Sequence, residues 1–225
     1  MNGDLLLMRS VGKADACELL ARAFAYPDIE LAHALVGGAF AHDCASSLAD
    51  AGCMIRDAEV LFTQYANPED SILECTRMEF TRLYLNPAHV LVYPYESAFI
   101  HVESGHEGVP ALFRTPITLD VESQMREAGV MPKNARKEPC DSVFQEFEFL
   151  SYLYGSLASA MQQEDADAEK AWQMRIDRFL DSHALRWMPA FMERTIQHSD
   201  DSVYGAFAQV SLTLLDQLAS ETQTR

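Results

Sequence analysis

Apolar side chains recur along most of this chain at spacings of three and four residues, the spacing of one face of an α-helix. One such stripe, ended by Pro27, contains Ala16, Leu19, Leu20, Ala23 and Phe24. A second stripe, entered through Asp201 and Ser202, contains Val203, Phe207, Val210, Leu214 and Leu218. Alternating apolar and polar runs, which are typical of strands, are hard to find. We therefore expect an all-α fold that resembles a helical bundle.

The segment GVMPKNARKEPCDS, residues 129–142, breaks the helical pattern with one glycine, two prolines and a small group of basic residues. We interpret residues 131–140 as a hinge between two helical subdomains. The first subdomain is expected to contain residues 1–130, including an irregular region at 86–117, and the second residues 141–225.

A wide apolar face directly after this segment predicts a central helix. Its members are Val143, Phe147, Leu150, Tyr154, Leu157 and Met161. Asp141 or Ser142 can cap its start, and Ser142 with Gln145 fits the capping-box pattern. The run SILE at 71–74 has the related Ser-x-x-Glu form and predicts another helix start.

The charge balance narrows the class of partner. The chain has 17 Lys and Arg against 34 Asp and Glu, a net charge of −17. Nucleic-acid binding needs a basic surface, so we expect no nucleic-acid partner. The acidic charge favours a basic partner instead, although acidity that only keeps the protein soluble explains the composition equally well.

No apolar run approaches the roughly 18 residues that cross a bilayer, so we expect a cytoplasmic chain without stable membrane insertion. Five dispersed cysteines without a CxxC pair indicate reduced thiols.

Residues 86–117 carry many prolines and glycines, and within them YPYESAFIHVESG, residues 93–105, concentrates aromatic and acidic side chains. The candidate metal ligands here are His101, Glu103, His106 and Glu107. Two glycines interrupt the segment, so the i, i+4 ligand geometry of a helix is not expected, and we predict no metal and no cofactor. Nucleophile-elbow, Walker and dinucleotide motifs are absent, which argues against an enzyme.

The residue types of this segment fit a binding surface better than a catalytic site. Tyr93, Tyr95 and Phe99 offer rigid contact area, and Glu96 offers charge for a cationic partner. The alternative is that the rings only pin the segment to the helices beneath it, and the residues by themselves favour that alternative.

Three segments resemble signatures of the TorD/DmsD/NarJ family of redox-enzyme maturation chaperones, with the TorD/DmsD branch the closest. These segments are EFTRLYLNPAHVLVYPYESAF at 79–99, EPCDSVFQEFEFLSYL at 138–153 and FLDSHALRWMPAF at 179–191. The resemblance implies an all-helical cytoplasmic chaperone. Its partner would be the twin-arginine leader and the body of a molybdoenzyme catalytic subunit, whose folding, cofactor insertion and export proofreading it assists.

The resemblance also implies the peptide-binding residues, which are Phe80, Leu83, Tyr84, Pro94, Tyr95, Glu96, Glu138 and Asp141. The acids would meet the two arginines and the apolar residues would form a wall, although core packing explains Phe80 and Leu83 equally well. Ser142 stands where the family usually has histidine. His183 and Trp187 are interpreted as packing residues, and no phosphate loop supports guanine-nucleotide binding.

Two alternatives stay open. One is a helical metalloprotein or enzyme that uses the His101–Glu107 loop, and the other is an adaptor for an unrelated client. The chain could be a monomer or a homodimer that exchanges subdomains across its hinge.

Overall fold

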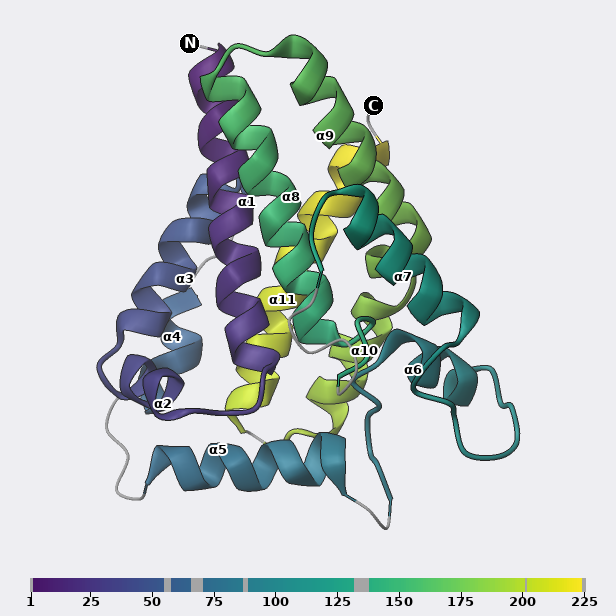
Figure 1. Ribbon diagram of the computed structural model, residues 1–225. Coiled ribbons are helices and arrows are strands. Elements are labelled where there is room, and N and C mark those ends of the chain that lie inside the picture. The colour runs from purple at the N-terminus through teal and green to yellow at the C-terminus, as the bar shows by residue number, and fades with distance from the viewer. Residues whose placement is uncertain are drawn as a thin grey trace.

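The computed structural model describes residues 2–54, 58–65, 71–86, 89–131, 138–200 and 202–223 (Figure 1). Within these ranges all regular elements are helical, which confirms the all-α expectation. The α-helices are α1 Asn2–Phe24, α2 Ile29–Val36, α3 Ala39–Asp50, α4 Ala58–Phe62, α5 Ile72–Phe80, α6 Glu96–Glu103, α7 Pro116–Glu127, α8 Val143–Gln162, α9 Ala166–Phe179, α10 Leu185–His198 and α11 Val203–Gln223. A 3₁₀ turn, η1 Thr63–Tyr65, follows α4, and single π-helical turns, η2 Thr81–Leu85 and η3 Leu180–Ala184, extend α5 and α9.

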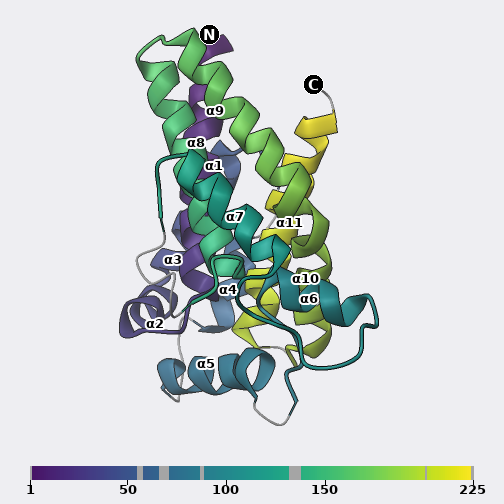
Figure 2. The same cartoon turned by 45° about the vertical axis from the view of Figure 1, so that its right-hand side comes forward.

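Two long helices, α1 and α8, lie side by side through the middle of the molecule (Figures 1 and 2). Helix α8 buries residues around most of its circumference, as the wide apolar face predicted. Phe147 of α8 stacks on Phe24 of α1 with the ring centroids 6.3 Å apart. α9 returns along α8, α10 and α11 pack together, and α5 crosses the lower end of the bundle.

One hydrophobic core joins the two proposed subdomains. It contains residues of α1 and α3 together with residues of α8, α10 and α11. The division at residues 131–140 therefore stays a prediction, and residues 132–137 of the proposed hinge lie outside the described part of the chain. All five cysteines are free thiols, and four of them are buried. In the described residues, no helix combines the length and apolarity needed to cross a bilayer.

The region 86–117 is more regular than the sequence predicted. YPYESAFIHVESG contains α6, which begins at Glu96 and ends at Glu103, and α7 begins at Pro116. The expectation of an irregular region is therefore wrong for ten of its residues, the eight of α6 and the first two of α7. The prolines and glycines that suggested a loop flank α6 instead of interrupting it.

Two predicted helix caps also differ in detail. Ser71 and Ser142 do occupy the N-cap positions of α5 and α8, but neither hydroxyl makes a capping hydrogen bond. Asp28 and Thr115 do cap their helices with side-chain oxygens. Asp201, proposed as a cap for α11, lies outside the described residues.

Candidate functional site

Two segments far apart in the sequence are joined by backbone hydrogen bonds at the start of α8. The Val143 amide donates to the Pro94 carbonyl at 2.9 Å, and the Glu96 amide donates to the Asp141 carbonyl at 2.8 Å. Between them, Tyr95 and Ser142 form an isolated antiparallel bridge. The YPYES and CDS motifs of the first two signature segments therefore form one structural unit.

Asp141 caps α6 from outside that helix. Its Oδ2 accepts the Ser97 amide at 3.0 Å, which satisfies one of the free N–H groups of the first turn. Its other oxygen, Oδ1, has no hydrogen-bond partner in the described structure, and the residue has 0% exposure. Burial, together with the charge of Glu96, outweighs the hydrogen bonds from Ser97 and raises the pKa of Asp141 to about 6.

Glu96, the first residue of α6, pairs with a buried histidine. Its Oε2 lies 2.7 Å from His183 Nδ1, and His183 Nε2 lies 2.9 Å from Asp120 Oδ2 on α7. Burial alone lowers the pKa of His183, but hydrogen bonds and negative charge from Glu96 and Asp120 outweigh this and raise it. The surrounding acids therefore favour the protonated form of His183, and its imidazole connects η3 with α6 and α7.

A third carboxyl group, Glu146, lies on the first turn of α8 with 0% exposure. Trp187 of α10 donates its indole N–H to Glu146 Oε2 at 3.0 Å, while Oε1 has no partner among the described residues. Burial and the nearby charge of Glu96 raise the pKa of Glu146 well above its usual value. We refer to Glu96, Asp141 and Glu146 as the buried acid cluster.

Tyr95 and Glu138 lie at the outer edge of this cluster and are half-buried. Their side chains interact, and burial is the main cause that raises the pKa of both groups. Of the eight residues predicted to bind a peptide, these two are partly accessible and the other six are buried. We refer to Tyr95 and Glu138 as the rim of the cluster.

The predicted residues do not all lie together. Phe80, Leu83 and Tyr84 belong to the hydrophobic core, with exposures of 7%, 0% and 2%. Phe80 contacts Tyr26 and Tyr204, and the Tyr84 hydroxyl lies 3.2 Å from Thr195 Oγ1. Pro94 is buried too. In this conformation these side chains pack the core, and their contact with a peptide stays a prediction.

The structure brings acids together that the sequence reasoning missed. Glu146 and Asp120 are not among the site residues that the sequence predicts, and the sequence predicts only a packing role for His183 and Trp187. His183 and Trp187 are buried, but each also forms a hydrogen bond with a carboxyl group, that of Glu96 and Glu146 respectively. The only sequence signal for Glu146 is its place inside the second signature segment, EPCDSVFQEFEFLSYL.

The His101–Glu107 segment does not assemble a ligand set. Throughout the described residues, no group of three or more His, Cys, Asp or Glu side chains is placed to hold a metal ion. His101 and His106 stack with their ring centroids 5.3 Å apart, and Glu103 forms an ion pair with Arg194 at 3.0 Å.

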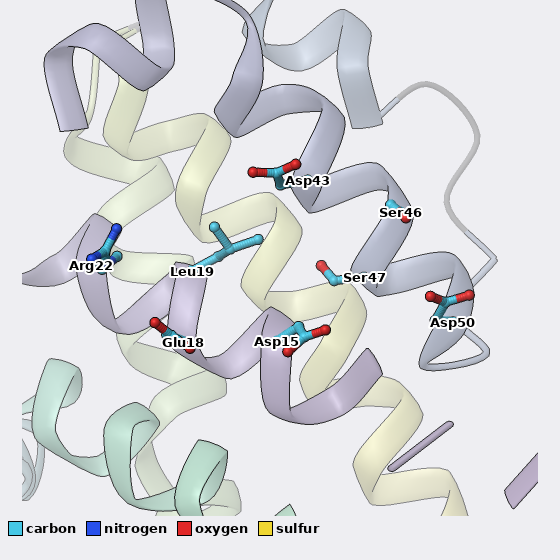
Figure 3. Close-up of a pocket in the computed structure, with 8 residues that line it drawn as sticks. All are labelled: Asp15, Glu18, Leu19, Arg22, Asp43, Ser46, Ser47 and Asp50. Carbon is cyan, nitrogen blue, oxygen red and sulfur yellow. The ribbon is translucent and has the colours of Figure 1, made fainter. Parts of the chain in front are cut away.

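A separate acidic hollow of about 370 Å³ lies between α1 and α3 (Figure 3). Asp15 and Glu18 of α1 and Asp43 and Asp50 of α3 line it, with Arg22 at one end. We call it the α1–α3 groove. Its acids are exposed or half-buried, in contrast to those of the buried acid cluster.

Comparisons with known proteins agree with the resemblance. A family model described as "Nitrate reductase delta subunit" matches residues 53–193, a range that contains all three signature segments. A protein of Vibrio cholerae named "Chaperone protein TorD" is 28% identical over 180 residues, which are 76% of this chain and 74% of that protein. Proteins of the same name from Vibrio atlanticus and Photobacterium profundum are 26% and 25% identical over 155 and 138 residues. Those matches cover 69% and 61% of this chain, and 66% and 59% of the relatives.

Proposed function

The chain belongs to the nitrate reductase delta subunit family and is a chaperone, and from this premise we propose that it binds the twin-arginine signal peptide of a molybdopterin-containing oxidoreductase subunit. In this proposal it acts in the cytoplasm and assists the folding, cofactor insertion and export proofreading of that subunit. It needs no cofactor of its own.

The observation that carries the proposal is the surplus of acceptors over donors in the buried acid cluster. Three carboxyl groups converge there, and His183 is the one cation that the described residues place among them. Asp141 Oδ1 is a buried acceptor without a partner among the described residues. The raised pKa of Glu146 favours its protonated form, whose O–H group is itself a donor, so the unpaired acceptor is the one on Asp141. A guanidinium group carries five N–H donors and no acceptor, so an arginine side chain satisfies such a set in a way that few other ligands do.

The rim gives the proposed order of contact. Tyr95 and Glu138 are partly accessible, so a peptide arginine meets them first and reaches Asp141 when the unit formed by residues 94–96 and 141–143 opens. Phe80, Leu83, Tyr84 and Pro94 are proposed to form the apolar wall that such an opening uncovers. Pairing of the arginine with Asp141 offsets the cost of opening this unit. The attraction is strong because the Asp141 carboxylate is buried away from water.

Calorimetric titration of a synthetic twin-arginine leader peptide tests this proposal. Asp141→Asn removes one charge-assisted contact of about 1.5 to 3 kcal/mol, so we expect affinity to fall about ten- to a hundredfold. Asp167→Asn is the matched control, since it makes the same change at an exposed position on α9.

A peptide with two lysines in place of the arginines separates this chaperone from an adaptor for an unrelated client. Lysine presents a point charge without the planar fork of donors, so we expect weaker binding to the wild-type chain. Equal affinities for both peptides, or an Asp141→Asn variant that is folded and binds like wild type, would contradict the proposal.

A further inference from the structure

The loop between α6 and α7, residues 104–115, exposes apolar side chains that the proposed leader site does not use. It projects beside α6 at the edge of the molecule (Figures 1 and 2). Val109 is 93% exposed and Phe113 is 46% exposed, and Ala111 between them is exposed as well. We refer to residues 109–113 as the strand-like segment.

The side chains of the strand-like segment alternate between solvent and protein. Pro110 is buried and Leu112 is half-buried, whereas the three odd-numbered residues are exposed. A period of two is that of an extended backbone. Gly108, with a φ of 95°, and Arg114, with a φ of 59°, turn the chain just before and just after the segment. One face of the segment therefore lies on the protein, and the other faces solvent.

The backbone of this segment is unpaired. Within the described residues, no backbone-to-backbone hydrogen bond uses an amide or carbonyl group of residues 107–114. In an extended segment, the N–H and C=O groups of successive residues point to opposite edges. The edge of Val109, Ala111 and Phe113 has a donor and an acceptor at each residue, whereas the other edge lacks the N–H of Pro110. The first edge, which we call the free edge, can therefore pair with another strand.

The strand-like segment is held in place at both ends and in its middle. Before it, the His106 amide donates to the His101 carbonyl at 3.2 Å, and the two imidazole rings stack. After it, the Thr115 hydroxyl accepts a hydrogen bond from the Thr118 amide at 3.0 Å and caps α7. Pro110 is buried between these anchors. A partner strand therefore meets a backbone that is already extended, which lowers the entropy cost of pairing.

Charge indicates what kind of partner fits this surface. The segment itself is uncharged, and one acid, Glu107, and one base, Arg114, flank it. The net charge of −17 lies elsewhere on the chain, so this surface does not favour a basic partner such as the leader. An uncharged peptide with apolar side chains at alternate positions complements it, since the peptide backbone pairs with the free edge and the side chains cover the exposed face.

A second copy of this chain fits the surface less well. Three side chains of this size expose on the order of 300 Å², well below the roughly 800 Å² that each partner buries in a stable interface. Two copies also repel each other, because each carries a net charge of −17. So small an interface suits a transient contact, as between a chaperone and a client that it later releases.

We propose that the free edge of the strand-like segment pairs with an extended, apolar segment of the client body and adds it as a β-strand. Main-chain hydrogen bonds provide the affinity, and Val109 and Phe113 contact alternate side chains of the client. Such a contact depends little on sequence, which fits a client that has not yet paired its own strands. This inference rests on the proposed function for the identity of the partner, but it concerns a surface separate from the buried acid cluster.

Fluorescence anisotropy with two labelled peptides tests the inference on the full chain. The first probe is a short peptide of alternating valine and threonine residues. The second is the same peptide with its internal amide groups N-methylated, which removes the hydrogen-bond donors along both of its edges while the side chains stay the same. We expect the wild-type chain to bind the N-methylated probe at least about tenfold more weakly than the first probe.

A substitution at the centre of the free edge provides the matching test on the chain. Ala111→Pro removes the central N–H, and Ala111→Ser is the control because it changes the side chain and keeps the N–H. No backbone hydrogen bond of the described residues uses the Ala111 amide, so neither variant should lose stability. Ala111→Pro should weaken the first probe about five- to tenfold and Ala111→Ser less than about twofold. Both variants should bind the leader peptide like wild type.

The inference is wrong if the wild-type chain fails to bind the first probe up to about 1 mM, if the N-methylated probe binds equally well, or if Ala111→Pro binds like wild type. It is also wrong if analytical ultracentrifugation shows a wild-type dimer that Ala111→Pro dissociates, because the segment then pairs with a second copy. Leader binding that stays intact in these cases leaves the proposed function standing. A chain that binds the first probe but no leader peptide would instead overturn the proposed function and keep this surface.

Discussion

The buried acid cluster and the α1–α3 groove contain the same type of side chain in opposite surroundings. Each gathers several carboxyl groups near one cation, His183 in the cluster and Arg22 in the groove. Glu96, Asp141 and Glu146 are at most 1% exposed, whereas Asp15, Glu18 and Asp43 are exposed to solvent. The cluster raises the pKa of Asp141 to about 6 and that of Glu146 well above its usual value.

The difference shows why a net charge of −17 does not locate a binding site. Solvated carboxylates in the groove interact weakly with any cation, because water and salt screen them. Buried carboxylates interact strongly with the few donors that reach them, and they destabilise the chain when those donors are missing. The cluster therefore has large consequences for both stability and recognition, and the groove has small ones.

The largest expected effect comes from removing the buried cation. His183→Leu leaves Glu96 buried without its partner, so the free energy of unfolding should fall by about 3 to 5 kcal/mol. Arg22→Leu removes the cation of the groove and should change the free energy of unfolding by less than about 1 kcal/mol. Urea unfolding of both variants measures the contrast, and similar losses would show that the two regions do not differ as we describe.

A second substitution in the cluster should raise the free energy of unfolding instead of lowering it. Asp141→Asn keeps an oxygen that accepts the Ser97 amide but removes the cost of a buried charge, so at pH 8 the variant should be more stable than wild type by on the order of 2 to 3 kcal/mol. Asp15→Asn in the groove should change the free energy of unfolding by less than about 0.5 kcal/mol. The Asp141→Asn variant would then be more stable than wild type but bind the leader more weakly, a trade-off that is common at functional sites.

The pH dependence of this gain follows from the direction of the pKa shift. Burial raises the pKa of Asp141 from 3.8 to about 6, so in this range the folded chain binds a proton more tightly than the unfolded chain. The stability that protonated Asp141 contributes is present below pH 4 and is lost as the pH rises through about 6. The advantage of Asp141→Asn should therefore disappear near pH 4. An advantage that is constant between pH 4 and pH 8 would exclude titration of Asp141 as its cause.

A smaller effect is expected at the rim. Tyr95→Ala removes apolar contact area, so it should weaken leader binding by about 1 to 2 kcal/mol, or roughly five- to thirtyfold. This loss should be the same at two salt concentrations, whereas the loss in Asp141→Asn should shrink slightly, because salt screens a buried charge much less than an exposed one. Calorimetry at both concentrations separates the two contributions, and a strongly salt-dependent Tyr95→Ala effect would assign the rim an electrostatic role instead.

The smallest effect is expected in the groove. Glu18→Gln together with Asp43→Asn removes two exposed charges, and we expect leader affinity to change less than about twofold at physiological salt. A tenfold loss in this double variant, with wild-type stability retained, would transfer peptide recognition from the buried acid cluster to the α1–α3 groove.

The sequence by itself determined the fold class and the family. Helical periodicity is a local property of the chain, so the stripes of α1, α8 and α11 could be read without knowing their partners. The three signature segments are also local, and all of them lie in the range that matches the family. Local patterns also placed Ser71 and Ser142 at helix starts, although their hydroxyls do not form the expected bonds.

Only the tertiary structure decided which of these residues form a site. Helix α6 was missed because its cap is Asp141, 44 residues further along the chain, and no local pattern contains that contact. The Glu96–His183 pair spans 87 residues for the same reason. Burial depends on packing among α6, α7, α8 and α10, and burial gives Asp141 and Glu146 their raised pKa values while it encloses Phe80, Leu83 and Tyr84 in the core. A sequence states which side chains carry charge, but the free energy of a charge depends on how much water remains around it.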